Sequence, residues 1–155
     1  LISPDEVQKV GFACPPFAYL LNLLHSCAIS THAPNGEVQT HLMWIDYKDN
    51  QLIINTEKDR KKAQNIRSNN SISLVIFHPE AMYSSWEVRG EVVEIIEDIS
   101  ANDHIDQVSI RYTGKPYRRE LNEPWSEDIK SREKWIIRAS KLITMVRPQA
   151  KSESE

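Results

Sequence analysis

The chain of 155 residues is poor in cysteine. Cys14 and Cys27 are the only two, they form no CxxC pair, and no histidine accompanies them at zinc-finger spacing. The sequence therefore predicts neither a disulfide framework nor a zinc site. Two isolated cysteines are typical of buried apolar side chains in a protein of the reducing cytoplasm.

Long hydrophobic runs are also missing. The longest apolar stretch near the start, residues 15–29, is interrupted by Asn22 and His25. It is shorter than the ~20 residues that a membrane helix needs, and no basic segment with a small-residue cleavage site precedes it. We therefore expect no membrane helix, no targeting signal and a cytoplasmic protein.

Charge of one sign is not in excess. The chain has 19 Lys and Arg against 22 Asp and Glu, with 40% apolar and 26% charged residues. These values are typical of a globular protein. Because aromatic residues are not interleaved with basic ones and the net charge is negative, nucleic acid is not an expected partner. The length predicts a single domain at residues 1–150, followed by a disordered tail at residues 151–155.

Two kinds of local pattern follow one another along the chain. Residues 1–25 have the apolar spacing of helices. After them, apolar runs typical of strands alternate with turn signals, at residues 26–31, 37–47, 51–56, 71–77, 86–96, 133–139 and 142–146. A short helix is predicted from a capping box at Ser100 and Asp103 to Gly114, and Gly90 suits a bulge. Six or seven antiparallel strands with few helices favour a mainly β fold, a small closed barrel, because closure removes exposed edges.

A cationic segment follows the strand at residues 51–56. Thr56 is the expected N-cap of a helix, with Asp59 as its capping partner, and the first turn and a half then holds Arg60, Lys61 and Lys62. Each cation at a helix N-terminus costs roughly 0.3–1 kcal/mol, whereas a bound phosphate would be stabilised by the helix dipole, the free N–H groups and the cations together. At about 100° per residue, at most two of the three side chains reach one group.

A solvated helix face is the alternative for this segment. Ala63 and Ile66 would then be buried, and the charges would serve solubility. The pattern alone leaves the choice between a phosphate site and a solvated face open.

Histidines and the strand at residues 37–47 offer few further signals. The five histidines, which are His25, His32, His41, His78 and His104, show no metal-ligand spacing, so we expect no metal site. Along the strand, Leu42 and Trp44 alternate with His41 and Met43, so one set faces the core and the other faces outward. An outward His41 and Met43 would need a partner surface, which a cofactor or a second subunit would supply.

Several segments resemble one known family. Thr56, Arg60, Lys62, Ala63 and Asn65, followed by Ile66 and the strand at residues 71–77, resemble the T-x-x-x-R-x-K-A-x-N-L motif of the pyridoxamine 5'-phosphate oxidase-like flavin-binding split barrels. Residues 38–56 and 86–95 resemble the family's hairpin and its V-x-G strand. "HIDQVSIRYTGKPY", residues 104–117, is similar to a segment of the branch that uses the deazaflavin coenzyme F420.

The resemblance implies a mainly β fold, a six-stranded antiparallel split β-barrel, and a homodimer with two cofactor sites at its interface. Thr56, Arg60, Lys61 and Lys62 would hold the cofactor's phosphate. Thr40, His41, Leu42, Met43 and Trp44 would flank its ring, with Ile54 and Asn55 beside the ring or the ribityl chain. Ser84, Ser85 and Trp86 would come from the other subunit.

The same resemblance implies an oxidoreductase that binds FMN or the deazaflavin coenzyme F420 and transfers a hydride to or from a small organic substrate. The cofactor's ring would carry the hydride, so no catalytic side chain is assigned. Ile45 stands where the oxidases themselves carry a basic residue, and their C-terminal Arg-x-His arrangement has no match, so oxidation of pyridoxamine phosphate is not expected. A non-catalytic carrier or sensor of flavin or tetrapyrrole (heme) on the same fold is the alternative.

Overall fold

A computed structural model describes residues 26–49, 51–117 and 132–144 of the chain. Its elements are, in chain order, β1 (Ser26–His32), β2 (Val38–Met43), β3 (Asp46–Lys48), β4 (Gln51–Glu57), α3 (Lys61–Ser68), β5 (Ser71–His78), β6 (Ala81–Ile96), α4 (Ile99–Thr113) and β7 (Arg132–Thr144). The helices expected within residues 1–25 and the tail expected at residues 151–155 lie outside the described residues. Strands dominate the described part, as the mainly β prediction required.

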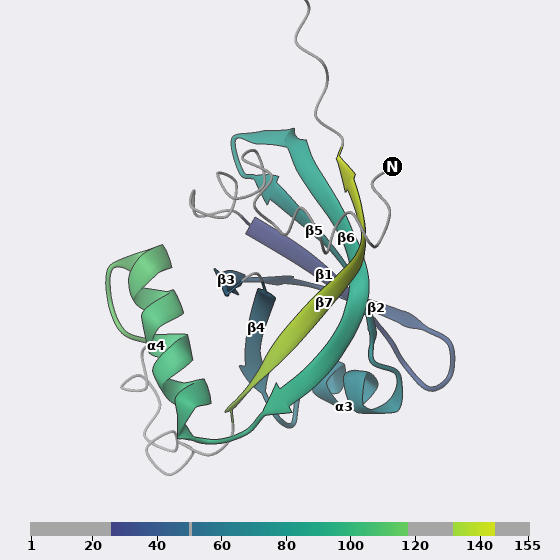
Figure 1. The fold of residues 1–155 in the computed structure, drawn as a ribbon, viewed down its shortest axis with the longest axis horizontal. Coiled ribbons are helices and arrows are strands. Elements are labelled where there is room, and N and C mark those ends of the chain that lie inside the picture. Colours follow the sequence, from purple (N-terminus) through teal and green to yellow (C-terminus); the bar gives the residue numbers. More distant parts are fainter. Residues whose placement is uncertain (1–25, 50, 118–131, 145–155) are drawn as a thin grey trace, which may run out of the picture.

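The strands form one antiparallel sheet with the order β2-β1-β5-β6-β7-β4-β3. The sheet curls on itself, with α4 beside one flank and α3 at its lower end (Figure 1). Its two edge strands, β2 and β3, are consecutive in the chain and are joined through Trp44 and Ile45. The two edges are thus joined by a bend of the chain and not by hydrogen bonds between strands, which confirms the split-barrel fold. The closed barrel that the strand pattern favoured is wrong.

Two expected strand boundaries were wrong. The strand expected at residues 37–47 is divided, because β2 pairs with β1 whereas β3 pairs with β4 at the opposite edge. One straight strand cannot pair with both edges, so the chain bends and the expected strand becomes two. Conversely, the strand expected at residues 133–139 and the described part of the one expected at residues 142–146 form the single strand β7, because its ladder with β6 continues across two register shifts. In the described residues the sheet therefore has seven strands, one more than the resemblance implied.

Gly90 lies at the first of these shifts, which confirms the bulge expected there. The register of β6 against β7 changes between Arg89 and Gly90. A Cβ atom at Gly90 would lie 2.2 Å from the carbonyl oxygen of Arg138 and 3.0 Å from the Cα of Ala139. Both contacts are backbone atoms, so a larger residue would push the two strands apart.

Side chains of β4 and β7 alternate between two faces. Ile54 and Trp135 are fully buried in the core inside the curl. Asn55 and Arg132 belong to the opposite face, where α4 packs: Asn55 Nδ2 donates to the carbonyl oxygen of Ala101 at 2.7 Å. Polar side chains of the sheet therefore meet α4 on this outer face. Figure 1 shows α4 beside this flank of the sheet.

The ends of α4 follow local capping rules. Its N-cap is Asp98, whose carboxylate accepts a hydrogen bond from the Ser100 N–H at 2.8 Å, so the capping box expected at Ser100 was wrong by two positions. The helix ends at Gly114, which has a φ of 78°, as the sequence predicted. Between these ends, His104, Ile105 and Val108 are buried.

Candidate functional site

The start of α3 has no capping side chain. Strand β4 continues through Thr56 to Glu57, since both residues pair with β7, so Thr56 is buried in the sheet and is not the expected N-cap. The N-cap is Arg60, which makes no side-chain capping hydrogen bond, and the first turn holds no acidic residue. The free N–H groups and the positive dipole end of α3 are therefore open to an anion.

Three cations gather around one carboxylate beside this helix start. Arg60 Nε lies 2.6 Å from Glu57 Oε2, and Arg132 Nη1 lies 3.6 Å from Glu57 Oε1. Burial lowers the pKa of Lys62, and the charge of Arg60 lowers it further, against the opposing effect of Glu57. The charge of Arg132 also lowers this pKa. We refer to Arg60 and Lys62 as the α3 cations.

His41 faces the α3 cations from β2. Its register partner on β1 is the fully buried Ile29, so the ring lies on the inner side of the sheet. Nε2 of His41 is buried and has no hydrogen-bond partner within the described part of the chain. Burial, followed by the charges of Lys62 and Arg60, lowers the pKa of His41. An anion placed here would relieve both the repulsion and the unsatisfied nitrogen.

Anion binding is therefore expected to raise the pKa of His41. The charged groups that face it are Lys62 and Arg60, while β1 presents the apolar Ile29. Sulfate, which does not titrate in this range, should bind more tightly as the pH falls from about 7.5 to about 5.5, because His41 takes up a proton with it. NMR titration of the His41 ring with and without sulfate measures this, and the exposed His32 is the internal control. A His41 pKa that does not respond to bound sulfate would contradict the expectation.

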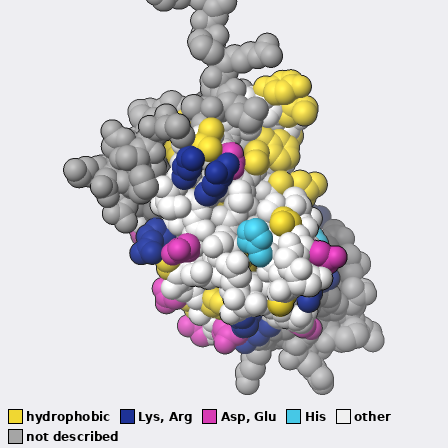
Figure 2. Space-filling view, turned by 90° about the vertical axis from the view of Figure 1, so that its right-hand side faces the viewer, with side chains coloured by type: hydrophobic (Ala, Val, Ile, Leu, Met, Phe, Trp, Pro, Cys, Tyr) yellow, Lys and Arg dark blue, Asp and Glu magenta, His cyan; other side chains and the backbone are white. Residues whose placement is uncertain are grey.

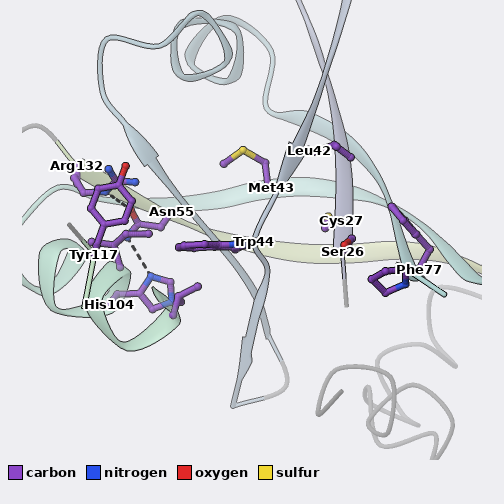
Figure 3. A pocket seen from close by; sticks show the side chains of 13 residues that line it. Ser26, Cys27, Leu42, Met43, Trp44, Asn55, Phe77, His104, Tyr117 and Arg132 are labelled. Atoms are coloured by element: carbon purple, nitrogen blue, oxygen red, sulfur yellow. Dashed lines mark hydrogen bonds between the residues drawn. The ribbon is translucent and has the colours of Figure 1, made fainter. Parts of the chain in front are cut away.

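An open cleft of about 560 Å³ lies between the sheet and α4. Trp44 lines it, and the Trp44 ring stacks on Tyr112 with centroids 5.2 Å apart and an interplanar angle of 13°. Figure 3 shows Met43 and Trp44 in the middle of the view, with a group of polar side chains to one side. The apolar lining also includes Phe77, Ile105 and Val108; the polar end consists of Asn55, His104, Tyr117 and Arg132.

Hydrogen bonds join the buried side chains of the polar end in one chain. Asn55 Oδ1 accepts from Arg132 Nε at 2.7 Å, so the amide nitrogen of Asn55 is the donor to His104 Nδ1 at 3.1 Å. His104 must then carry its proton on Nε2, which lies 2.9 Å from Asp46 Oδ2. The chain thus runs from Asp46 through His104 and Asn55 to Arg132. Figure 3 shows its part from His104 through Asn55 to Arg132.

Both ends of this chain are held in place. Burial alone raises the pKa of Asp46, but the hydrogen bonds of its carboxylate with His104, Arg111 and the Tyr47 N–H lower it to about 2. Arg111 Nη1 lies 2.6 Å from Asp46 Oδ1. At the other end, the guanidinium carbon of Arg132 lies 4.7 Å above the centre of the Tyr117 ring. Asp46 therefore stays ionised at neutral pH, and the orientation of Arg132 is set from two sides.

The predicted cofactor residues fall into three groups in the structure. His41, Arg60 and Lys62 meet at the start of α3, with Lys61 exposed beside them. Four predicted residues line the cleft: Leu42, Met43, Trp44 and Asn55. The remaining ones are elsewhere: Ile54, Thr56, Ser85 and Trp86 are buried, Thr40 is exposed, and of Ser84 only the place in β6 is described.

The side chains of β2 face opposite to the expectation: His41 and Met43 point inward, and Leu42 points outward. Leu42 is 75% exposed, and Thr40 Oγ1 lies 2.9 Å from Ser30 Oγ on the outer side of the sheet. His41 and Met43 are partly buried. Alternation along an edge strand defines two sets of side chains but does not say which set faces the core.

No sequence motif pointed to the polar end as a unit. His104 and Tyr117 are the first and last residues of the segment that resembles the deazaflavin branch, but the resemblance gave them no role. Asp46 lies in the hairpin that resembles the family's, which also gave it no role, and Arg132 lies in a stretch without any motif. The sequence signal for this group is weak: it consists of polar residues within strands, at positions that the structure shows to pack against a helix.

Large apolar side chains are exposed on the sheet. Leu42 and Val75 are both opposite Ala28 in the register of β2, β1 and β5, so all three lie on one face. Met82 and Tyr83 on β6 are exposed as well. Figure 2 shows apolar side chains gathered in the upper right of one face. Apolar surface of this kind is typical of a contact with another protein chain.

Membrane-spanning helices and metal sites are both absent from the described ranges. Neither helix there has the length and apolar character of a membrane span. Within residues 26–49, 51–117 and 132–144, no three His, Cys, Asp or Glu side chains are arranged to hold a metal ion.

Several solved structures have a similar fold. The chain is similar to a structure named F420 reductase, with 23% identity, 81% of this chain and 94% of the other covered, and a TM-score of 0.69. It is similar to the conserved hypothetical protein Rv2991 from Mycobacterium tuberculosis, with 24% identity, 83% and 81% covered, and a TM-score of 0.63. General Stress Protein 26 from Bacillus anthracis is 14% identical, with 84% and 92% covered and a TM-score of 0.60. No curated protein matches significantly. Residues 16–144 match the family model described as pyridoxamine 5'-phosphate oxidase, and the chain therefore belongs to that family.

Proposed function

We propose that the protein is an oxidoreductase that binds FMN or the deazaflavin coenzyme F420 and transfers a hydride to or from a small organic substrate. The observation that carries this proposal is the pair of α3 cations at an uncapped helix start, close to an apolar cleft lined by Trp44. A cofactor that joins a phosphate to a flat ring suits both parts. When bound, the ring would supply the hydride chemistry.

The phosphate would lie at the start of α3. Arg60 and Lys62 would contact it through their side chains, and the first N–H groups of the helix, that of Lys61 included, would donate to it. Thr56 lies on β4 just before this turn. His41 would complete the site from β2, where its buried Nε2 could donate to a phosphate oxygen once protonated.

The ring would lie along the end of β2 and reach the cleft. Residues 40–44 lead from His41, beside the α3 cations, to Trp44 in the cleft. Met43 and Trp44 would exclude water from the ring, while Asn55, with Ile54 beside it in the core, would flank the ring or the ribityl chain. The protein would thus bind the cofactor, orient its ring and exclude water from it, and no catalytic side chain is assigned.

We propose in addition that the protein is a homodimer in which each cofactor site draws on both subunits. The exposed apolar row of Leu42, Ala28 and Val75 supports a contact with a second copy. The stretch of β6 that holds Ser84 would then lie beside the cofactor of the partner subunit, while Ser85 and Trp86, which are buried in their own subunit, would support this stretch.

Titration with cofactors and their phosphate-free analogues tests the proposal. FMN is compared with riboflavin, and F420 with 8-hydroxy-5-deazariboflavin, by absorbance and fluorescence, and sedimentation of the same samples reports the dimer. One phosphate-bearing cofactor is expected to bind about 100-fold more tightly than its analogue, because two cations and a helix start contact the phosphate. If neither cofactor binds, the proposal is wrong. If a bound cofactor can be reduced by no donor, the protein is a carrier.

A further inference from the structure

The polar end of the cleft contains a fixed cation that the phosphate site does not use. Arg132 lines the cleft and is buried, with its Nε atom bonded to Asn55 and its guanidinium stacked on Tyr117. A guanidinium held in one orientation beside an apolar surface is suited to bind a planar oxyanion.

We propose that the cleft binds a small organic carboxylate, whose charged group is held by Arg132 and whose apolar body lies against Trp44 and Met43. This inference rests on the proposed function and deepens it, since it names the substrate class of the same site.

The charge distribution favours an anionic ligand. Glu57 Oε1 lies 3.6 Å from Arg132 Nη1, whereas Glu57 Oε2 lies 2.6 Å from Arg60 Nε. Glu57 is therefore shared between two cations. The charge of Arg132 also acts on Lys62, whose pKa it lowers. A carboxylate next to Arg132 would be attracted by the charge of Arg132 and, at longer range, by the charges of Arg60 and Lys62.

The remaining surface of the cleft favours an apolar body. Met43, Ile105 and Val108 line it, and Trp44 is kept in place by stacking on Tyr112. A volume of about 560 Å³ is within the range of sites for small ligands. A bound ring system would pack on Trp44 while its carboxylate pointed toward the polar end (Figure 3).

Asp46, His104 and Asn55 act as positioning residues in this proposal. The ionised Asp46 accepts a hydrogen bond from the Nε2–H group of His104, which fixes the imidazole so that Nδ1 accepts from Asn55. Asn55 then has only its oxygen to offer Arg132. The direction of each hydrogen bond is therefore determined by the one before it, and the guanidinium is oriented before any ligand arrives.

Calorimetric titration with 2-naphthoate and its neutral analogue 2-naphthamide tests the proposal. The full-length protein is used alone and after saturation with whichever cofactor binds. Wild-type protein is expected to bind naphthoate about 10-fold more tightly than naphthamide, because the carboxylate forms a charge-assisted pair with Arg132. Equal affinities would overturn the proposal, and this comparison needs no variant.

Variants locate the preference. Arg132→Gln should reduce the ratio of the two affinities to about 1 with naphthamide binding unchanged, and Arg132→Lys should keep part of it, since the charge stays but the fork is lost. Arg138→Gln, on the same strand but exposed and paired with Glu91, is the matched control. A full preference in Arg132→Gln would overturn the proposal. Asp46→Asn should lower the ratio of naphthoate to naphthamide affinity and leave naphthamide affinity unchanged. An equal loss of affinity for both ligands would overturn the positioning role of Asp46.

The cofactor titration is run on the same samples, so that two failures can be told apart. A naphthoate preference without any cofactor binding would overturn the proposed function but leave the carboxylate site. Cofactor binding without a preference would overturn the carboxylate site alone. Displacement of naphthoate by the cofactor would also overturn it, because the cleft would then belong to the cofactor.

Discussion

Replacement of Glu133 with glutamine is expected to lower the free energy of unfolding by about 3–5 kcal/mol. Glu133 is fully buried near the start of β7. Its carboxylate accepts from Arg67 Nη1 at 3.1 Å, from Arg67 Nη2 at 2.5 Å and from Trp135 Nε1 at 2.6 Å. Glutamine has nearly the same volume, but its amide N–H group would face the guanidinium, so Arg67 would lose its buried counter-charge.

Glu97 provides the matched control for this loss. It also accepts from Arg67 Nη2, at 2.7 Å, but its side chain is 48% exposed. Glu97→Gln should therefore cost less than about 1 kcal/mol. Urea denaturation followed by circular dichroism, at one fixed protein concentration, measures both variants. Equal destabilisation by the two substitutions would show that burial does not decide the strength of this pair.

The pair between Glu133 and Arg67 also bears on the proposed site. Arg67 lies in the last turn of α3, whose first residues carry the α3 cations. Glu133 attaches this helix to β7, and its neighbour Arg132 faces the cleft on the other side of the same strand. Loss of the pair should thus weaken cofactor binding as well as stability.

Replacement of Lys62 with glutamine is expected to weaken binding of the phosphate-bearing cofactor by about 30- to 100-fold and to leave its phosphate-free analogue nearly unaffected. Lys62 is partly buried near Arg60, and burial lowers its pKa. Such a cation loses little additional solvation when an anion arrives, so its pairing with phosphate should be strong. The effect should be larger at low salt.

Lys58→Gln is the control for this measurement. Lys58 belongs to the same basic segment, but its Nζ lies 3.7 Å from Glu97 and it has no part in the proposed site. Its substitution should leave both affinities within about twofold. Lys58→Gln and Lys62→Gln are each titrated by fluorescence with the phosphate-bearing cofactor and with its phosphate-free analogue. The four affinities separate the phosphate contribution from general effects of the substitutions. If Lys58→Gln and Lys62→Gln lose equal affinity for the phosphate-bearing cofactor, the basic segment is a solvated helix face and not a phosphate site.

The predictions that held depend on local chemistry. Gly114 ends α4 because it adopts a positive φ, and Gly90 marks the bulge because no Cβ fits against β7. Alternating apolar runs identified the sheet, and a basic helix after β4 was recognisable from its residues. The split barrel itself was inferred from a resemblance to a family and is supported by the sheet order.

The predictions that failed depend on pairing partners. Thr56 has the character of an N-cap, but its backbone pairs with Glu133 of β7, so the strand continues and the helix starts later. His41 and Met43 turned inward because β2 meets β1 with Ile29 opposite His41. Neither partner is close in sequence, and the competing local pattern was reasonable in each case.

The sequence by itself determined a mainly β fold, a short helix that ends at Gly114 and a basic helix that follows β4. Only the tertiary structure decided that Asp46, Asn55, His104 and Arg132 form one hydrogen-bonded chain in a cleft. The physical reason is that these four polar residues lie on four different elements. The packing of α4 on the outer face of β4 and β7 determines which of them come into hydrogen-bond distance. Local patterns encode the elements, whereas this packing alone brings their buried polar groups within hydrogen-bond distance.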